Sequence, residues 1–396
     1  MNHIGNYITP ALLIFMQVDI QLTQTERGIL GSIPMVMMVF MSTIIGWLGD
    51  RNPLLKKPLI WIGLFGIGAF CAIISFAHTF TELALATIIL GLALSAYHPL
   101  AFTYINTIPN RDRNMGINAV CGNAGNALTP FIAMIVAVIS GWRASFLFFG
   151  LIQFITGLGF VIFFPNDQQI ADTFEKKNTS VDARDKRFTG TEAKVLVLLL
   201  VLISAARGPV FRCLSFFTSI VFNDEFGFDK VASSIITAVV LGVGALASYL
   251  AGSYNNRKIT KNNSSKNDRV RFRVNMMLLS TGLTSIMLLV LVVAPVQPLF
   301  IMFVYLATAF AFFLGAAILP SIIAEIASKM SSSFGLMFTG ATLTGAIAPT
   351  VFGFLADAAG FSASFIFLDG VAVICMLLLV VFKISFKKMY DRPDQI

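Results

Sequence analysis

Uncharged stretches long enough to cross a bilayer recur along this chain, and they restrict its fold more than any other feature. A membrane-spanning helix needs about 20 consecutive apolar residues. Stretches without a formal charge cover residues 28–49, 58–77, 83–110, 114–142, 144–166, 231–256 and 330–356. Residues 274–324 are too long for one span, and the segment APVQP at 294–298 divides them in two. With the start of the chain and the segments around 195–222 and 358–382, the sequence predicts about twelve transmembrane helices.

The composition supports an all-α integral membrane protein. The chain is 57% hydrophobic and 12% charged, whereas a soluble globular protein carries about 25% charged residues. The sequence contains no nucleotide-binding loop, no Ser/His/Asp arrangement and no His/Cys cluster with metal-ligand spacing. We therefore expect no enzymatic activity, no cofactor and no metal. The expected partners are the lipid bilayer and a small-molecule substrate, with the protein acting as a monomer.

Basic residues gather on one side of the predicted helices, and this sets the orientation. If Met1 faces the cytoplasm and the helices alternate, the inner loops and the tail hold 23 of the 28 Lys and Arg residues. The outer loops keep only Arg27, Arg143 and Lys230. This asymmetry follows the positive-inside rule, so both termini are expected in the cytoplasm, and the membrane is expected to be the cell (inner) membrane. The net charge of +8 then reflects topology and not nucleic-acid binding, because the basic residues are dispersed.

The two halves of the chain repeat each other. GWRASFLFFG (141–150) matches GFSASFIFLD (360–369) at an offset of 219 residues. Further pairs at similar offsets are Gly116 with Gly335, Pro130 with Pro349, His98-Pro99 with Leu319-Pro320, and GWLGDR (46–51) with GSYNNR (252–257). Two parallel six-helix halves are a known transporter design, in which the substrate site lies at midplane between the halves.

A long polar loop separates the two predicted halves. We expect a first six-helix half at 1–164, a cytoplasmic linker at 165–192, a second half at 193–386 and a cytoplasmic tail at 387–396.

The loop after the second span resembles a motif of the major facilitator superfamily. The family reads Gly-x-x-x-Asp-Arg followed by basic residues, and this chain has GWLGDRNPLLKK at 46–57, matching at Gly46, Asp50 and Arg51. The resemblance covers essentially the whole chain and implies the twelve-helix fold of that family. It also implies that this loop biases the equilibrium between outward-open and inward-open states. Gly46 is expected to permit close helix approach. The alternative is a topological turn with a positive anchor.

The fifth span is similar to the glycine-proline motif of the family's antiporters. In GINAVCGNAGNALTPFIA (116–133), Gly116, Gly125 and Pro130 are in register, and Pro349 takes the place of Pro130 in the second half. Small residues let helices pack closely and pivot. The alternative is a plain packing helix with a proline kink.

Two further segments resemble the fosmidomycin-resistance branch of the superfamily. AYHPLAF in the fourth span and CGNAGNALTP in the fifth carry the likeness, and NHIGNY (2–7) and AEIASKMSSSFGL (324–336) extend it. The acid that follows His-Pro in that branch is Leu100 here. Members of the family usually carry a short cytoplasmic lead before NHIGNY, so we expect the native start to lie upstream of Met1.

Titratable and polar side chains inside the spans are the candidate substrate and coupling residues. Candidates are His98, Tyr97, Asn123, Asn126, Arg207 and Arg212. Histidine gains and loses a proton near neutral pH, so His98 is a candidate proton carrier; the alternative is a neutral imidazole bonded to a neighbouring helix. Pro99 is expected to kink its helix.

Two arginines lie in the seventh span, in SAARGPVFRCLSFF. Arg207 is near midspan, and Gly208-Pro209 is expected to break the helix beside it. Arg212 is expected to snorkel outwards. Few acids remain in the spans to neutralise them, so an anionic substrate is expected; the alternative is a structural ion pair.

These features together predict a secondary active transporter of a small organic solute that works by alternating access. We expect proton linkage, antiport, and efflux of an anionic or amphipathic compound. The alternatives are an uptake carrier for an organic anion or amino acid, and a non-transporting receptor with the transporter fold.

Overall fold

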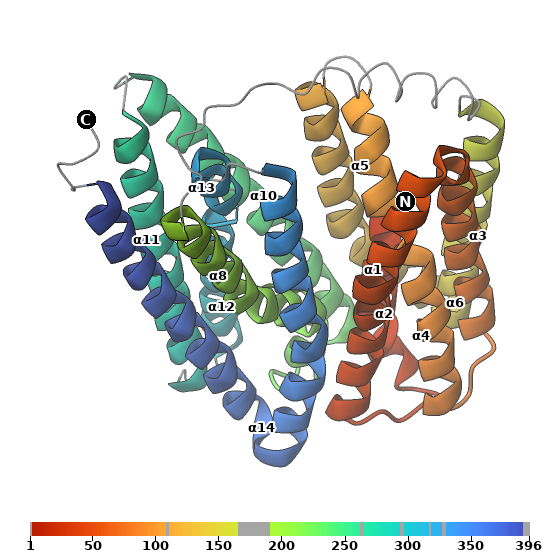
Figure 1. Ribbon diagram of the computed structural model, residues 1–396. Helices are drawn as coiled ribbons and strands as arrows, with labels where there is room; N and C mark the ends of the chain where they lie inside the picture. The colour runs from red at the N-terminus through yellow and green to blue at the C-terminus, as the bar shows by residue number, and fades with distance from the viewer. Residues whose placement is uncertain are drawn as a thin grey trace. The chain divides into compact units, whose positions relative to one another are not determined.

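The computed structural model describes residues 2–107, 111–164, 191–261, 265–293, 297–316, 318–326 and 330–390, and every regular element among them is helical (Figure 1). The elements are α1 (Asn2–Met16), α2 (Gln24–Arg51), the 3-10 turn η1 (Pro53–Leu55), α3 (Lys56–Ile74), α4 (Phe80–Leu94), α5 (Tyr97–Thr107), α6 (Arg111–Phe163), α8 (Thr191–Phe216), α9 (Thr218–Asp224), α10 (Lys230–Lys261), α11 (Lys266–Val293), α12 (Pro298–Leu314), α13 (Ile318–Ile326) and α14 (Met330–Tyr390). Within the described residues, nine helical stretches are long and apolar enough to cross a membrane. The helix order is consistent with twelve crossings, because α6 and α14 each turn back once and α4/α5, α8/α9 and α12/α13 are interrupted single spans.

The chain divides into two compact units. One contains residues 1–183 and 216–238, and the other contains residues 184–215 and 239–396. The segment 216–238 is therefore assigned to the first unit, although it follows α8 in the sequence. Asp224 in this segment pairs with the buried Arg27 at 2.5 Å and accepts a hydrogen bond from Gln24 at 2.8 Å. These bonds fix α9 against the start of α2.

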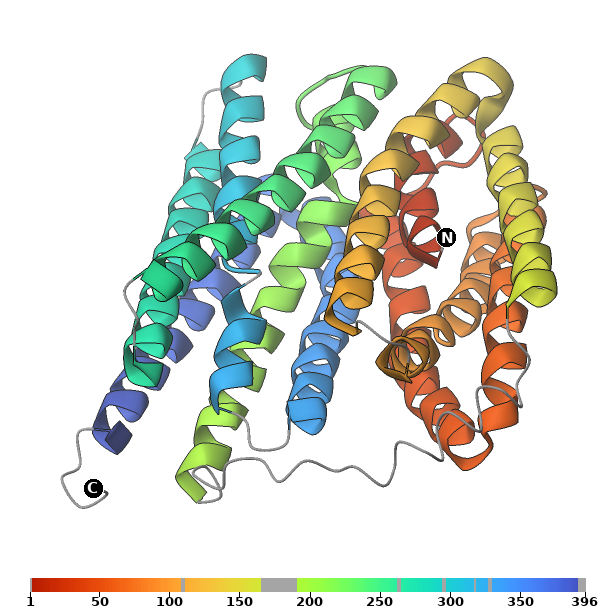
Figure 2. The same cartoon turned by 90° about the horizontal axis from the view of Figure 1, so that it is seen from above.

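The repeated sequence GWRASF/GFSASF forms the same corner in each unit. Gly141 in α6 has φ 83° and Gly360 in α14 has φ 81°, a left-handed conformation that glycine adopts without steric cost. The serine four residues later bonds across each corner: Ser145 Oγ donates to the Ala133 oxygen at 3.1 Å, and Ser364 Oγ donates to the Phe352 oxygen at 2.7 Å. Both corners are visible where α14 (Figure 1) and α6 (Figure 2) reverse direction. The internal repeat is thus a structural repeat.

Capping residues define where the first helices begin. Thr23 and Glu26 form a capping box at the start of α2, and Thr79 and Glu82 form another at the start of α4. In each box two backbone N–H groups that lack helical partners are satisfied.

Ion pairs join helix ends within each unit. In the first unit Asp19 accepts hydrogen bonds from Trp142 Nε1, at 2.9 Å, and from Arg143. The bond from Trp142 and then that from Arg143 lower the pKa of Asp19 below its ordinary value. In the second unit Glu325 accepts bonds from Arg269 Nε at 2.8 Å and from Arg273 Nη1 at 3.0 Å.

Apolar side chains fill the interior of the second unit. Its core residues come from α8, α10, α11, α13 and α14 and include Leu200, Val274, Ile322, Leu379 and Phe382. The polar site described next lies among these helices.

Candidate functional site

Arg207 lies where α8 packs very closely against α14. Its side chain is buried, with 7% exposed. A Cβ atom on the next residue, Gly208, would stand 2.1 Å from the Ala341 carbonyl oxygen and 2.8 Å from Thr344 Oγ1. Only a glycine fits at this approach, and the approach fixes the turn of α8 that carries Arg207.

The helix continues through Pro209, so the expected break at Gly208-Pro209 is wrong. α8 runs from Thr191 to Phe216 with Pro209 inside it. A proline has no N–H group and leaves the carbonyl four residues earlier without its helical donor. That carbonyl belongs to Ala205, and Thr344 Oγ1 donates to it at 2.6 Å. A side chain from α14 thus supplies the hydrogen bond that the proline cannot make.

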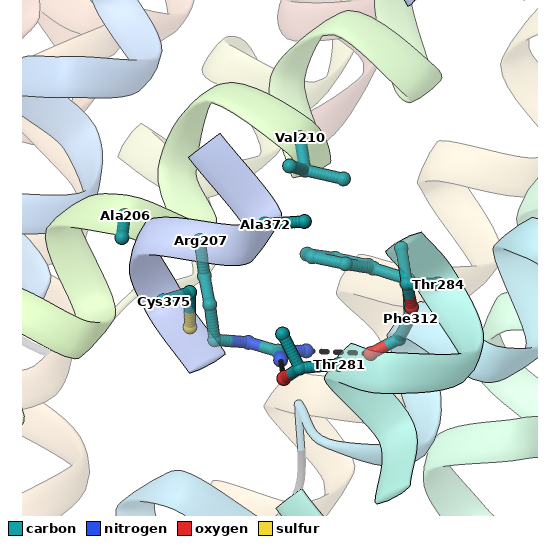
Figure 3. Close-up of a pocket in the computed structure, with 8 residues that line it drawn as sticks. All are labelled: Ala206, Arg207, Val210, Thr281, Thr284, Phe312, Ala372 and Cys375. Carbon is teal, nitrogen blue, oxygen red and sulfur yellow. Dashed lines mark hydrogen bonds between the residues drawn. The ribbon is translucent and has the colours of Figure 1, made fainter. Parts of the chain in front are cut away.

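The guanidinium group of Arg207 extends away from α8 towards α11 and α12 (Figure 3). Nη2 donates to the Phe312 carbonyl oxygen at 2.5 Å, and Nη1 donates to Thr281 Oγ1 at 3.4 Å. The guanidinium carbon lies 4.3 Å from the centre of the Phe312 ring, which adds a cation–π attraction. Within the part of the chain that the structure describes, none of these partners is a carboxylate.

A small cavity adjoins Arg207 inside the second unit. It is lined by Ala206, Arg207, Val210, Thr281, Thr284, Phe312, Ala372 and Cys375 (Figure 3). Besides the guanidinium, the polar lining groups are two threonine hydroxyls and one thiol. Its volume is about 10 Å³, so in this conformation it has room for no more than one water molecule beside the guanidinium.

The end of α12 depends on side chains from three neighbouring helices. The last carbonyl groups of a helix lack intrahelical donors and carry partial negative charge. Three donors satisfy them: Ser280 Oγ bonds the Ala311 oxygen at 2.6 Å, Arg207 Nη2 bonds the Phe312 oxygen at 2.5 Å, and Ser248 Oγ bonds the Phe313 oxygen at 3.1 Å. Arg207 therefore supplies positive charge to the negative end of α12, where the span formed by α12 and α13 is interrupted.

The fourth span of the first unit is interrupted at the corresponding place. α4 ends at Leu94 and α5 begins at Tyr97. Pro99 cannot donate to the Ser95 carbonyl, and Ser42 Oγ donates to that oxygen instead, at 3.1 Å. The expected irregularity at His98-Pro99 is confirmed, and it lies one turn before the proline because that is where the hydrogen bond is lost.

His98 and Tyr97 lie together at the start of α5. Both are half-buried, and their ring centres are 5.4 Å apart with an edge-to-face geometry. Tyr97 donates through its hydroxyl group to Asn118 Oδ1 on α6 at 2.8 Å. The structure brings these polar groups of α5 and α6 together within the first unit. Asn118 lies beside them although the sequence did not single it out as a site residue.

The remaining candidates are distributed as follows. Arg212 is buried, with 6% exposed, so the expectation that it snorkels outwards is wrong: the close packing of α8 on α14 at Gly345 encloses it. Asn126 is half-buried on α6, and the side chain of Asn123 lies outside the described residues.

The motif of Gly46, Asp50 and Arg51, which is expected to act in gating, lies at the end of α2. A Cβ on Gly46 would lie 3.6 Å from Pro99 Cβ, an ordinary contact, whereas a Cβ on Gly49 would lie 2.6 Å from Leu100 Cδ2. Both glycines therefore face α5, and the atom nearest to Gly49 is the end of the flexible Leu100 side chain. The role expected for Gly46 stays a prediction. Arg51 is exposed and stacks over Trp47 at 5.4 Å. The side chain of Asp50 lies outside the described residues.

The helix-pivot motif lies within α6, which passes through Pro130 without ending. Thr129 Oγ1 donates to the Gly125 carbonyl at 2.5 Å. Pro349 occupies the equivalent place inside α14. Gly116 lies outside the residues whose surroundings the structure describes.

Comparison with known proteins agrees with this architecture. The sequence profile of the Major Facilitator Superfamily matches residues 1–262. The chain belongs to this superfamily.

Among proteins of known description, the chain is 24% identical over 360 residues to a probable sulfoacetate transporter, SauU, of Cupriavidus necator, covering 86% of this chain and 81% of that one. It is 25% identical over 155 residues to a probable L-galactonate transporter of Escherichia coli, covering 38% of this chain and 34% of that one. A crystal structure of a bacterial homologue of the human lysosomal transporter Spinster, inward-facing and unoccupied, superposes with a TM-score of 0.75 at 13% identity, over 99% of this chain and 97% of that one. This chain is thus an integral membrane transporter with the major facilitator fold.

Proposed function

We propose that this transporter moves a small organic anion across the cell (inner) membrane by alternating access, with proton linkage. The observation that carries the proposal is the Arg207 site: a buried guanidinium beside a cavity, with carbonyl, hydroxyl and aromatic partners but no carboxylate among those described. A buried guanidinium whose described N–H bonds go only to neutral oxygens favours an anionic ligand, because its bonds to an anion are stronger than its bonds to a neutral acceptor.

The relatives support an anionic substrate. One is described as a probable sulfoacetate transporter and another as a probable L-galactonate transporter, and both compounds are small anions. An anion reaching Arg207 competes with the Phe312 carbonyl oxygen for the Nη2 group. Charge-assisted bonds from guanidinium to carboxylate or sulfonate are stronger than a bond to a neutral carbonyl, so the exchange is favourable.

The remaining assignments follow from the candidate residues. His98 takes the coupling proton, because imidazole titrates near neutral pH and lies next to Tyr97 and its partner Asn118. Asn123, Asn126 and Arg212 contribute polar groups to the transport path. The motif at Gly46, Asp50 and Arg51 sets the balance between the two open states, and Pro130 and Pro349 act at helix pivots.

Direction and topology complete the proposal. We retain efflux by antiport, a monomer, both termini in the cytoplasm, and membership of the fosmidomycin-resistance branch, on the strength of the motifs AYHPLAF and CGNAGNALTP. The basic inner loops support the orientation.

Transport in liposomes tests the function. Purified protein is reconstituted, and movement of labelled sulfoacetate and L-galactonate is followed with and without an imposed pH gradient. We expect gradient-dependent movement of at least one anion and none of neutral galactose. Arg207→Ala should weaken anion binding, while Arg257→Gln, at an exposed arginine of α10, should leave it unchanged. Equal movement of galactose and galactonate, or wild-type binding in Arg207→Ala, would refute an anion site at Arg207.

A further inference from the structure

One carboxylate is buried in the second unit, on a helix that also lines the cavity beside Arg207. Asp369 on α14 is 8% exposed, and it is the one acidic residue that is buried among those whose side chains the structure describes. Its Oδ1 accepts a hydrogen bond of 2.5 Å from Ser285 Oγ on α11. Asp369 makes no described ion pair. A buried carboxylate, like a buried guanidinium, is costly unless a charge of opposite sign lies nearby.

The same two helices carry Asp369 and the cavity. Ala372 and Cys375 line the cavity from α14, while Thr281 and Thr284 line it from α11. Asp369 is three residues before Ala372, so the two share a face of the helix about 4.5 Å apart along its axis. Ser285, which holds the carboxylate, follows Thr284 directly. The Asp369 carboxylate is thus within about one helical turn of the cavity into which Arg207 extends.

We propose that Asp369 is the counterion of Arg207 across this cavity, with Ser285 fixing the position of the carboxylate. The two charges interact through a region of low polarity, where attraction persists over longer distances than in water. This arrangement neutralises the guanidinium without occupying its N–H groups, so these stay directed at the end of α12. Asp369 is therefore a positioning residue for Arg207.

The other groups around the pair do not compensate the charge of Arg207. α11 faces the pair with hydroxyl groups only, at Thr281, Thr284 and Ser285. α12 contributes Tyr305, whose ring packs on Phe365 one turn before Asp369, and α14 contributes the thiol of Cys375. Arg212, on the same helix as Arg207, lies next to Gly345 in the first part of α14. The inference holds whether or not Arg207 also binds substrate.

A double-mutant cycle on the full-length protein tests this inference. The variants are Arg207→Gln, Asp369→Asn and the double variant, and the readout is the thermal unfolding midpoint in detergent. Each single variant leaves one buried charge without its counterion and should lower the midpoint by about 5 °C or more. The double variant removes both charges and should unfold at a higher temperature than either single variant.

A matched cycle at two exposed residues of the same unit, Arg257→Gln and Asp268→Asn, should give shifts that simply add. If a single variant does not fold, the yield of monodisperse protein replaces the midpoint, and it should recover in the double variant. Additive losses at Arg207 and Asp369, or a double variant as poor as the worse single variant, would overturn the inference.

Sulfoacetate transport by the double variant separates this inference from the proposed function. A stable double variant that does not transport supports both. A stable double variant that transports like wild type leaves the counterion relationship intact and refutes Arg207 as the anion-binding residue.

Discussion

Replacing Gly208 with alanine should destabilise the second unit, because α8 and α14 touch at that residue. The added Cβ would lie 2.1 Å from the Ala341 oxygen, whereas ordinary contact begins at 3.4 Å, so the helices must separate by about 1.3 Å. Overpacking of this kind costs about 1–3 kcal/mol, and the helix preference of alanine over glycine returns about 0.5–1 kcal/mol. We expect a net loss of about 1 kcal/mol, which corresponds to a fall of about 2–4 °C in the unfolding midpoint for a unit of this size.

Gly370→Ala provides the matched control on α14. No atom lies within 4 Å of a Cβ built at Gly370, so this substitution should raise stability by about 0.5–1 kcal/mol. Thermal unfolding of both purified variants in the same detergent measures the difference. The separation should also shift Arg207 relative to Phe312 and reduce anion binding. If Gly208→Ala is as stable as Gly370→Ala, the close approach of the two helices is not as described.

Three further predictions concern charged and titratable residues. Burial acts to raise the pKa of Glu325, but hydrogen bonds and charge from Arg269 and Arg273 outweigh it and hold the pKa below its usual value. The stabilisation is therefore complete at neutral pH and is lost as the pH falls through the lowered pKa. Glu325→Gln should lower the free energy of unfolding by about 1–3 kcal/mol at pH 7, and this difference from wild type should disappear in acid. A difference that does not depend on pH would contradict the prediction. Asp50→Asn should slow anion movement in liposomes while the protein stays folded, and wild-type turnover would exclude a gating role. His98→Gln should abolish the pH dependence of transport but keep substrate binding; if the pH profile is unchanged, His98 is structural and the proton binds elsewhere.

The sequence determined the membrane class and the helical repeat. Runs of apolar residues have one stable solution in a bilayer, the helix, because every backbone group must find a partner within the segment. Gly141 and Gly360 could be matched by their flanking letters alone, and both turned out to have positive φ. The interruption near Pro99 was also predictable, because the missing N–H group is a property of the residue itself.

Whether a helix continues past a proline was decided only by the tertiary structure. Pro209 and Pro99 remove the same kind of bond, yet α8 continues and the fourth span is interrupted. In each case a hydroxyl group from another helix bonds the free carbonyl, Thr344 for Ala205 and Ser42 for Ser95. Nothing in the local sequence indicates which distant side chain will reach a given carbonyl or whether the helix will bend there.

Which neighbouring helix each buried arginine faces was also decided by the tertiary structure. Helical periodicity gives the angle between Arg207 and Arg212 but not which neighbouring helix each one faces. The contact of Gly208 with Ala341 fixes the rotation of α8, which places Arg207 on the Phe312 carbonyl and encloses Arg212. Arg207, Thr281, Phe312 and Cys375 are far apart in the sequence, and only the packing of α8, α11, α12 and α14 places them around one cavity. Side-chain contact between helices is set by their relative rotation and not by their composition.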